Sequence, residues 1–189
     1  MHKLCIAFVF CAGASFAQNT PEDKPVTRTE FVLLFDRFTK LLNTTYMPTR
    51  AIKTAPHGYG GVTARESNAL NRLVGDGIFP AGNGVKFDGA KPATRFQAAL
   101  SLDRLVQLLR PKFIRTSSDK NISTRRIRGV EKDGSQAAML RLAKGGFIPF
   151  GSPLFEGPGQ TIHPRTMSAL LAQAAERIAW HFRKKDTKF

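Results

Sequence analysis

The sequence is poor in cysteine and has no long apolar run. Its only cysteines, Cys5 and Cys11, both lie near the start. No segment approaches the roughly 20 apolar residues that a membrane-spanning helix needs. If the start is removed, the remaining chain has no thiol, no disulfide and no thiolate metal site. Its stability must then come from an apolar core.

The first seventeen residues have the pattern of a cleaved secretory signal. A charged start and a short apolar run over 4–12 precede the small-residue site Ser15-Phe16-Ala17, as in secretory signals. We therefore expect residues 1–17 to be removed and the chain to be exported to the cell envelope, the periplasm or the cell surface. Lipidation at Cys11 is the alternative, but a bulky phenylalanine precedes this cysteine where small residues are wanted.

Acidic residues are also scarce. The chain has 14 acidic and 29 basic residues and a net charge of +15, and removing residues 1–17 takes away one lysine and no acid. Such a charge predicts an anionic partner. The segment 112–128 has one acid, Asp119, among six basic residues, and a basic tail follows at 183–189. Such a run is either a solvated loop or a contact surface for an acidic polymer, including phosphate-bearing glycan or nucleic acid.

Signatures of catalysis or of cofactor binding are missing as well. The four histidines do not have metal-ligand spacing, and there is no phosphate-binding Gly-x-x-x-x-Gly-Lys motif. A pair of carboxylates, with Glu66 or Glu156 as the acid, could in principle form a glycosidase site. Nothing local distinguishes either residue, so we predict no enzymatic activity, no cofactor and no metal.

An internal repeat is the strongest positive signal. Residues 24–42 and 91–109 share nine identities in nineteen aligned positions, beginning with Lys-Pro-x-Thr-Arg in both copies. A third, weaker copy begins at 162 and keeps the arginine as Arg165. Each copy continues into an amphipathic helix with apolar residues at helical spacing. These apolar residues are predicted to pack in the core: Phe31, Leu34, Phe35, Phe38, Leu41 and Leu42; Ala98, Leu102, Leu105, Leu108 and Leu109; Met167, Leu170, Leu171, Ala174, Ala175 and Ile178.

A second kind of segment precedes the last two of these helices. Residues 69–80 align with 138–149, and each reads as a short helix that ends at glycine and then proline. A glycine-rich loop follows in both cases, with Phe87-Asp88-Gly89 in the first loop matching Phe155-Glu156-Gly157 in the second. Short helix, Gly/Pro loop and capped helix together form the repeated unit.

These features resemble the S-layer homology domain. The resemblance rests on the short helix ending in Leu-x-x-x-Gly-Ile, the loop with phenylalanine and glycine, and the Pro-x-Thr-Arg entry to the next helix. It covers 24–42, 63–110 and 134–180, joined by linkers 43–62 and 111–133. It implies one all-α domain over 24–182, with helix-loop-helix units packed about a pseudo-threefold axis. It also implies an exported module that binds cell-wall polysaccharide or peptidoglycan-linked polymer.

The sequence departs from that family in several places. Ala64-Arg65 and Asp133-Gly134 stand where the family has a His-Trp pair, and the first unit lacks room for its opening helix. The third unit has His163-Pro164-Arg165 in place of the Thr-Arg entry. The resemblance assigns polymer binding to the arginines Arg28, Arg95 and Arg165. We count Thr27 and Thr94, which precede the first two, among the candidate ligand-binding residues.

The Thr-Arg pair also has a physical interpretation of its own. Thr27 with Glu30, and Thr94 with Gln97, fit the capping box that starts a helix. An arginine in the first helical turn faces the positive end of the helix dipole, which is unfavourable. A bound anion, held by helix N–H groups and the guanidinium, would explain it. The alternative is an intramolecular pair, for example with Asp88, or simple solvation.

Two further features have structural and functional interpretations. The repeated pairs Asp36-Arg37 and Asp103-Arg104 are expected to join neighbouring units through ion pairs, with contact to a ligand as the alternative. Trp180 is expected to cap the core, although its ring could stack on a sugar.

Two function classes remain open at this point. The first is a non-catalytic module that binds an anionic wall glycan. The second is an exported basic protein that binds another envelope protein, lipid head groups or nucleic acid.

Overall fold

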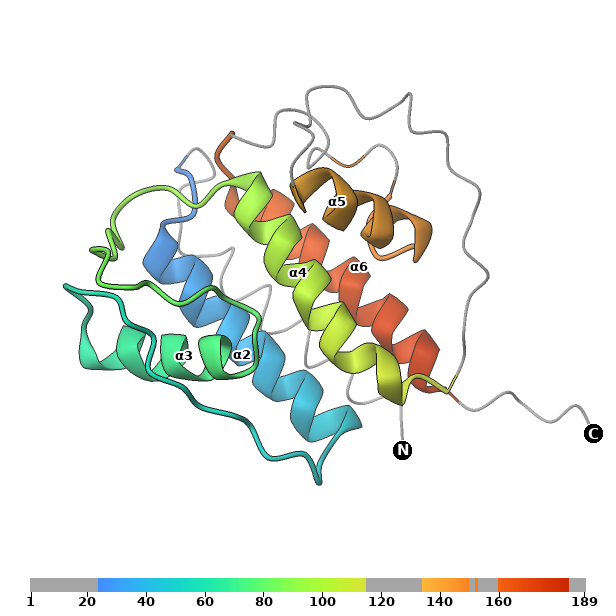
Figure 1. Ribbon diagram of the computed structural model, residues 1–189. Helices are drawn as coiled ribbons and strands as arrows, with labels where there is room; N and C mark the ends of the chain where they lie inside the picture. Colours follow the sequence, from blue (N-terminus) through green and yellow to red (C-terminus); the bar gives the residue numbers. More distant parts are fainter. Residues whose placement is uncertain (1–23, 115–133, 150–151, 153–159, 184–189) are drawn as a thin grey trace, which may run out of the picture. The chain divides into compact units, whose positions relative to one another are not determined.

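The computed structural model describes residues 24–114, 134–149, 152 and 160–183 (Figure 1). Within these residues the secondary structure is helical, with isolated β-bridges and no strand. This confirms the predicted all-α class. The expected signal, most of the basic linker and the Phe155-Glu156-Gly157 loop lie outside the described residues. The helices are α2 (Arg28–Tyr46), α3 (Ala64–Gly75), α4 (Arg95–Leu109), the 3-10 helix η1 (Arg110–Lys112), α5 (Gly134–Lys144) and α6 (Pro164–Phe182).

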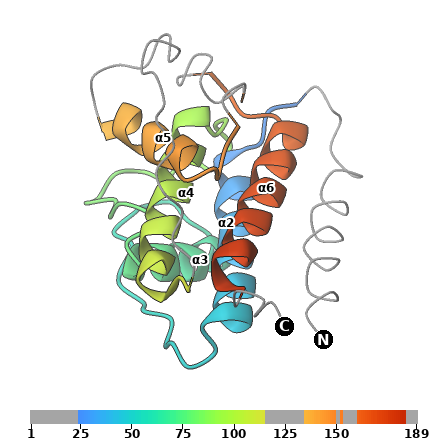
Figure 2. The same ribbon diagram turned by 90° about the vertical axis from the view of Figure 1, so that its right-hand side faces the viewer.

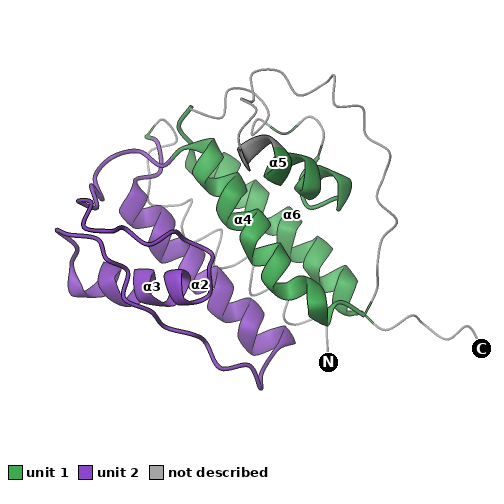
Figure 3. Cartoon of the chain, viewed as in Figure 1, with its two compact units in different colours: residues 1–24, 94–189 green, residues 25–93 purple. Residues whose placement is uncertain are grey.

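The chain divides into two compact units (Figure 3). Unit 2 spans residues 25–93 and contains α2 and α3, whereas the described helices of unit 1 are α4, η1, α5 and α6. The boundary falls inside the predicted repeat 63–110, between the loop after α3 and the start of α4. Each unit therefore combines the capped helix of one repeat with the short helix of the next. The threefold arrangement stays a prediction.

Capping boxes start three of the helices. The Thr27 hydroxyl accepts from the Glu30 backbone N–H at 3.2 Å, and the Glu30 carboxylate accepts from the Thr27 backbone N–H at 2.8 Å. Thr94 and Gln97 form the same box at α4. Both predicted boxes are thus confirmed. A third box, Thr63 with Glu66, starts α3. It follows the same Thr-x-x-Glu pattern but was not predicted.

The two short helices end in the same way. Gly77 and Gly146 have φ angles of 73° and 74°, which favour glycine because the left-handed region is costly for other residues. After α3, Ile78 N–H donates to Leu73 O at 2.8 Å and Gly77 N–H donates to Val74 O at 2.9 Å. The equivalent bonds follow α5, so both helices end in a Schellman motif. The predicted glycine stops are confirmed.

The apolar face of α2 forms the core of unit 2. Phe31 and Phe35 are buried with their ring centroids 5.4 Å apart, and the Phe79 ring beyond α3 lies 5.8 Å from that of Phe31. Phe38 and Leu42 are buried as predicted. Leu34 and Leu41, also predicted for this stripe, remain partly accessible, while Val32, which was not predicted, is buried. The buried stripe is therefore rotated slightly from the predicted one.

In unit 1, α4 and α6 run in the same direction and are joined at both ends. At their starts, Arg95 N–H donates to Gln160 O at 2.8 Å, and at their ends Ile114 N–H donates to His181 O at 2.9 Å. Both views show this shared direction (Figures 1 and 2). The predicted stripe of α6 is buried throughout, and that of α4 is buried except at Leu108, which stays partly accessible.

Each short helix packs on the capped helix that precedes it in the chain, α3 on α2 and α5 on α4. Arg72 of α3 bonds Asp36 of α2, and Arg141 of α5 bonds Asp103 of α4. The predicted role of both aspartates, joining neighbouring repeats through ion pairs, is confirmed. Arg37, the neighbour of Asp36, is exposed.

Candidate functional site

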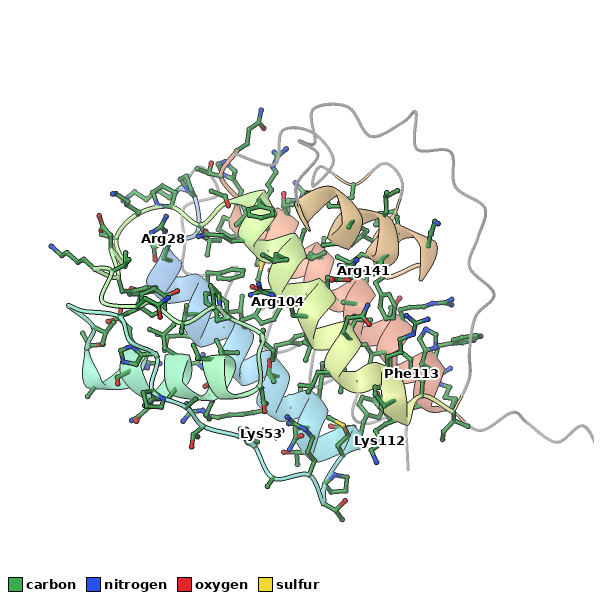
Figure 4. The ribbon with its side chains drawn as sticks, viewed as in Figure 1. Arg28, Lys53, Arg104, Lys112, Phe113 and Arg141 are labelled. Atoms are coloured by element: carbon green, nitrogen blue, oxygen red, sulfur yellow. The ribbon has the colours of Figure 1, made fainter. Side chains whose placement is uncertain are left out.

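Arg28 is the predicted site residue whose surroundings are most unusual. It is the first residue of α2, directly after the N-cap Thr27, and its side chain is half-buried (Figure 4). Its Nε is buried without a hydrogen-bond partner. The suggested pairing of Arg28 with Asp88 is wrong, because Asp88 forms its ion pair with Lys91 at 3.2 Å. A buried donor without an acceptor costs roughly 1–3 kcal/mol.

The backbone donors at the start of α2 are already occupied. Arg28 N–H donates to Lys91 O at 2.8 Å and Thr29 N–H donates to Gly89 O at 3.0 Å. The third donor, Glu30 N–H, bonds the Thr27 hydroxyl. The expectation that free helix N–H groups assist in holding an anion is therefore wrong at α2. At the start of α2 this leaves the Arg28 guanidinium as the group that could contact an anion.

Arg95 has the same position in α4 that Arg28 has in α2. It is the first residue of its helix, follows the N-cap Thr94 and is half-buried. Its backbone N–H donates to Gln160 O, just as that of Arg28 donates to Lys91 O. In both cases the acceptor lies three residues before the N-cap of the next capped helix, Thr94 or His163. The repeat in sequence thus gives a repeated environment at these two arginines.

Arg165 differs from the other two arginines. It is the second residue of α6, after Pro164, and its side chain is exposed. His163 occupies the N-cap position without a side-chain capping bond. Arg165 therefore lacks both the preceding threonine and the partial burial. Thr27 and Thr94 act as N-caps, with their hydroxyls turned to backbone N–H groups.

A histidine and a serine come together in unit 2. His57 Nε2 lies 3.0 Å from Ser67 Oγ, and His57 Nδ1 accepts from Tyr59 N–H at 2.8 Å. Because Nδ1 accepts a hydrogen bond, the proton of the neutral imidazole is on Nε2. The Nε2–H group therefore donates a hydrogen bond to the serine hydroxyl. A general base for serine needs the opposite tautomer. This pair therefore orders the loop and does not activate Ser67.

Glu66, the carboxylate considered for catalysis, is tied into the fold. It closes the α3 capping box and accepts a hydrogen bond from the Thr29 hydroxyl of α2. Burial acts to raise its pKa, but the bonds from Thr29 and Thr63 outweigh burial, so the pKa is lowered from 4.5. A lowered pKa is the opposite of what a general acid needs. The link from Thr29 to Glu66 was not predicted, because it joins residues far apart in the sequence.

A cavity of about 110 Å³ lies in unit 1, beside the ends of α4 and α5. Its polar lining includes Arg110, Arg141 and Lys144, together with the buried carboxylate of Asp103. Phe113, labelled in Figure 4, and the rings of Phe147 and His181 contribute an aromatic wall. The His181 ring stacks on Phe113 at 4.3 Å and on Phe147 at 5.4 Å.

Trp180 lies near the end of α6 and is partly accessible. The guanidinium carbon of Arg177 lies 4.3 Å from the centre of its ring. Arg177 also donates through Nε to Gly145 O at 2.7 Å, and burial lowers the pKa of this guanidinium. Trp180 thus packs against a cation of its own unit. This favours the structural role predicted for Trp180 over stacking on a sugar.

No group of three metal-ligating side chains occurs in the part of the chain that the structure describes. None of the described helices is long and apolar enough to cross a membrane. Comparisons with protein-family models, with curated proteins and with solved structures give no match.

Proposed function

We propose that this chain is an exported, non-catalytic module of the cell envelope that binds an anionic wall polymer. The polymer is a cell-wall polysaccharide or a peptidoglycan-linked chain with carboxylate or phosphate groups. Arg28, Arg95 and Arg165, each in the first turn of a helix, contact it. The resemblance to S-layer homology domains supplies this polymer class, and the repeated entry segment supports it.

The observation that carries the proposal is the state of Arg28. Its guanidinium is half-buried, its Nε has no acceptor, and the described residues place no carboxylate within ion-pair distance of it. A carboxylate or phosphate would supply the missing acceptor in two-point geometry. Arg28 is therefore expected to contribute more to polymer binding than an exposed cation such as Arg165 does.

The experiment is binding of the purified chain to cell-wall sacculi, measured by co-sedimentation. Arg28→Gln should weaken binding about tenfold, the loss expected for one charge-assisted hydrogen bond. Arg37→Gln is the matched control, because Arg37 is exposed on the same helix and its substitution removes the same charge. Equal loss in the two variants, or no sacculus binding at all, would contradict the proposal.

The second candidate function is a general basic interaction protein. It is favoured by the net charge of +15 and by exposed cations in both units, such as Arg37, Lys91 and Lys112. Its partners would be another envelope protein, lipid head groups or nucleic acid. Binding that follows total charge and disappears at moderate salt would support it, because exposed charges are screened within about 8 Å at physiological ionic strength.

A further inference from the structure

The two helix pairs have the same plan but differ at their C-terminal ends. Asp36 with Arg72 and Asp103 with Arg141 are equivalent contacts, at offsets of 67 residues along the capped helices and 69 along the short helices. The same offsets match Asn43 with Arg110 and Asp76 with Gly145. The ends of α2 and α3 can therefore be compared directly with the ends of α4 and α5.

In unit 2 an arginine and its acceptors lie between the C-terminal ends of α2 and α3. Arg50 donates to both carboxylate oxygens of Asp76, one of these bonds being 3.1 Å long, and to Asn43 Oδ1 at 3.2 Å. The Asp76 carboxylate has 1% side-chain exposure and also accepts from Lys53 N–H. Cation and carboxylate thus neutralise each other between the two helix ends.

In unit 1 the carboxylate is missing and cations have been added. Gly145 stands where unit 2 has Asp76, Arg110 stands where it has Asn43, and Lys144 stands where it has Gly75. The 110 Å³ cavity lies here, and Arg110 and Lys144 line it. In the part of the chain that the structure describes, neither cation lies within ion-pair distance of a carboxylate.

The charge balance of the cavity is positive even after the helix ends are counted. Arg110, Arg141 and Lys144 oppose the single carboxylate of Asp103. The C-terminal ends of α4 and α5 each add about half a negative charge, which reduces the excess to about one positive charge. A cation at the C-terminal end of a helix is favourable in itself. That effect alone does not explain why Arg110 and Lys144 both lie where unit 1 lacks the counterpart of Asp76.

The basic linker is a poor occupant for this cavity. Between residues 115 and 128 it carries five cations and one acid, Asp119, so its charge has the same sign as the cavity. Size also limits the ligand. A volume of about 110 Å³ exceeds that of one water but is below the roughly 300–1,000 Å³ of sites that enclose a whole small molecule. It fits an anionic group and part of the ring that carries it.

We propose that this cavity is a second anion site, which takes the phosphate or carboxylate group of an acidic sugar. The anion occupies the place of the missing Asp76 counterpart and is bound by Arg110 and Lys144. The edges of Phe113 and Phe147 contact the apolar part of the sugar ring. This site is independent of Arg28, and it exists whether or not the chain binds a wall polymer.

Trp180, the single tryptophan of the chain, provides a readout, because its ring lies 4.9 Å from that of His181 in an edge contact. We would titrate the full chain at physiological ionic strength with a hexose phosphate and with glucuronate, following tryptophan fluorescence, and confirm affinities by calorimetry. Glucose is the neutral control. We expect saturable binding of both acids and none of glucose.

Arg110→Gln and Lys144→Gln should each weaken the acid sugars about tenfold or more, as expected for the loss of a charge-assisted contact. Lys112→Gln is the matched control, since Lys112 is exposed in η1, as Arg110 is, but does not line the cavity. It should change affinity less than about twofold, as a screened surface charge does. Circular dichroism of each variant would show that the helices are retained.

Several results would overturn the second site. They are the absence of saturable binding in the unaltered chain, equal weakening by Lys112→Gln, and unchanged affinity in both cavity variants. Arg28→Gln separates this site from the proposed polymer function, because it should leave the fluorescence titration unchanged. Loss of the titration in Arg28→Gln would place the sugar elsewhere and contradict the inference. Loss of sacculus binding in the same variant would leave it intact.

Discussion

Arg72 on α3 holds Asp36 on α2 through two hydrogen bonds, Nε to Oδ1 at 2.8 Å and Nη2 to Oδ2 at 2.9 Å. Arg141 holds Asp103 in the same way, at 3.0 and 2.7 Å. The hydrogen bond with its aspartate raises the pKa of each arginine, although burial opposes this. Two-point contacts of this kind fix both distance and orientation. They set the register of each short helix on the capped helix that precedes it.

Removing the charge of Asp36 should therefore destabilise the chain. Asp36→Asn keeps the side-chain shape but leaves the Arg72 guanidinium, 25% exposed, with one acceptor oxygen in place of two. Hydrogen bonds to charged groups contribute roughly 1.5–3 kcal/mol, and partial exposure places the expected loss near the lower end of this range. The free energy of unfolding, measured by urea denaturation, tests this.

Asp88→Asn is the control for this prediction. The ion pair of Asp88 with Lys91 is exposed, with 39% and 65% side-chain exposure, and such pairs contribute roughly 0–1 kcal/mol. A loss in Asp88→Asn as large as that in Asp36→Asn would show that the buried geometry has no special value.

The helices could be predicted because their signals are local. The Thr-x-x-Glu/Gln boxes, the glycine stops and the apolar stripes each act within one or two turns of helix, and most were found. The pairing of α3 with α2 was less accessible, because the capping-box carboxylate of Glu66 reaches Thr29 across 37 residues. Repetition supplied the one long-range clue, since Asp36 and Asp103 recur at a constant offset.

Acid should weaken the contact between the starts of α2 and α3. The pKa of Glu66 is lowered from 4.5 in the folded chain. A lowered folded pKa means that the stabilisation is fully present above the unfolded pKa and is lost as the pH falls through the folded pKa. Unfolding free energies measured between neutral pH and well below pH 4.5 should show this loss, with the slope centred below 4.5.

Glu66→Gln provides the comparison for the acid prediction. Glutamine can still close the capping box, as Gln97 does at α4, but it has no charge to titrate. The variant should be less stable at neutral pH by about 1 kcal/mol, and its deficit should shrink as the pH falls. A deficit that stays constant with pH would rule out the carboxylate of Glu66 as the source of the acid sensitivity.

A close backbone contact at Gly75 leads to a third, independent prediction. A Cβ at this position would lie 2.5 Å from Lys53 O and 2.6 Å from Thr54 Cα. These are backbone atoms, so relief requires the segment after α2 to move away from α3. Gly75→Ala is therefore expected to destabilise the chain by about 1–3 kcal/mol, despite the higher helix propensity of alanine.

Gly60→Ala is the matched control, because a Cβ there would meet no atom within 4 Å and the residue does not need a left-handed conformation. It should be neutral or slightly stabilising, since alanine restricts the unfolded chain. Thermal unfolding followed by circular dichroism would separate the two variants. Equal melting temperatures would contradict the close contact at Gly75.

The candidate sites were only partly accessible from the sequence. Arg28 stood out because an arginine opposes the helix dipole, and this argument required one copy of the repeat and no structure. The sequence did not reveal that the backbone N–H groups of Arg28 and Thr29 are occupied, because their acceptors, the carbonyls of Lys91 and Gly89, come from a distant loop. The cavity could not be predicted without knowing that α4 packs on α5. Once that pairing is known, the replacement of Asp76 by Gly145 is visible in the sequence itself.

The start of α6 offers a gain in stability. His163 has φ and ψ angles of −94° and 155°, close to the −99° and 156° of the N-cap Thr94, but its side chain makes no capping bond. Because the backbone already has the capping conformation, a threonine oxygen at this position would reach the backbone N–H of Thr166. His163→Thr should raise the free energy of unfolding by about 0.5–1 kcal/mol.

Thr94→Ala, which removes an existing cap, should lower the free energy of unfolding by a similar amount. Urea denaturation of the two variants would measure both effects, and a threonine at 163 that failed to stabilise would mean that the Pro164 entry holds α6 without a cap.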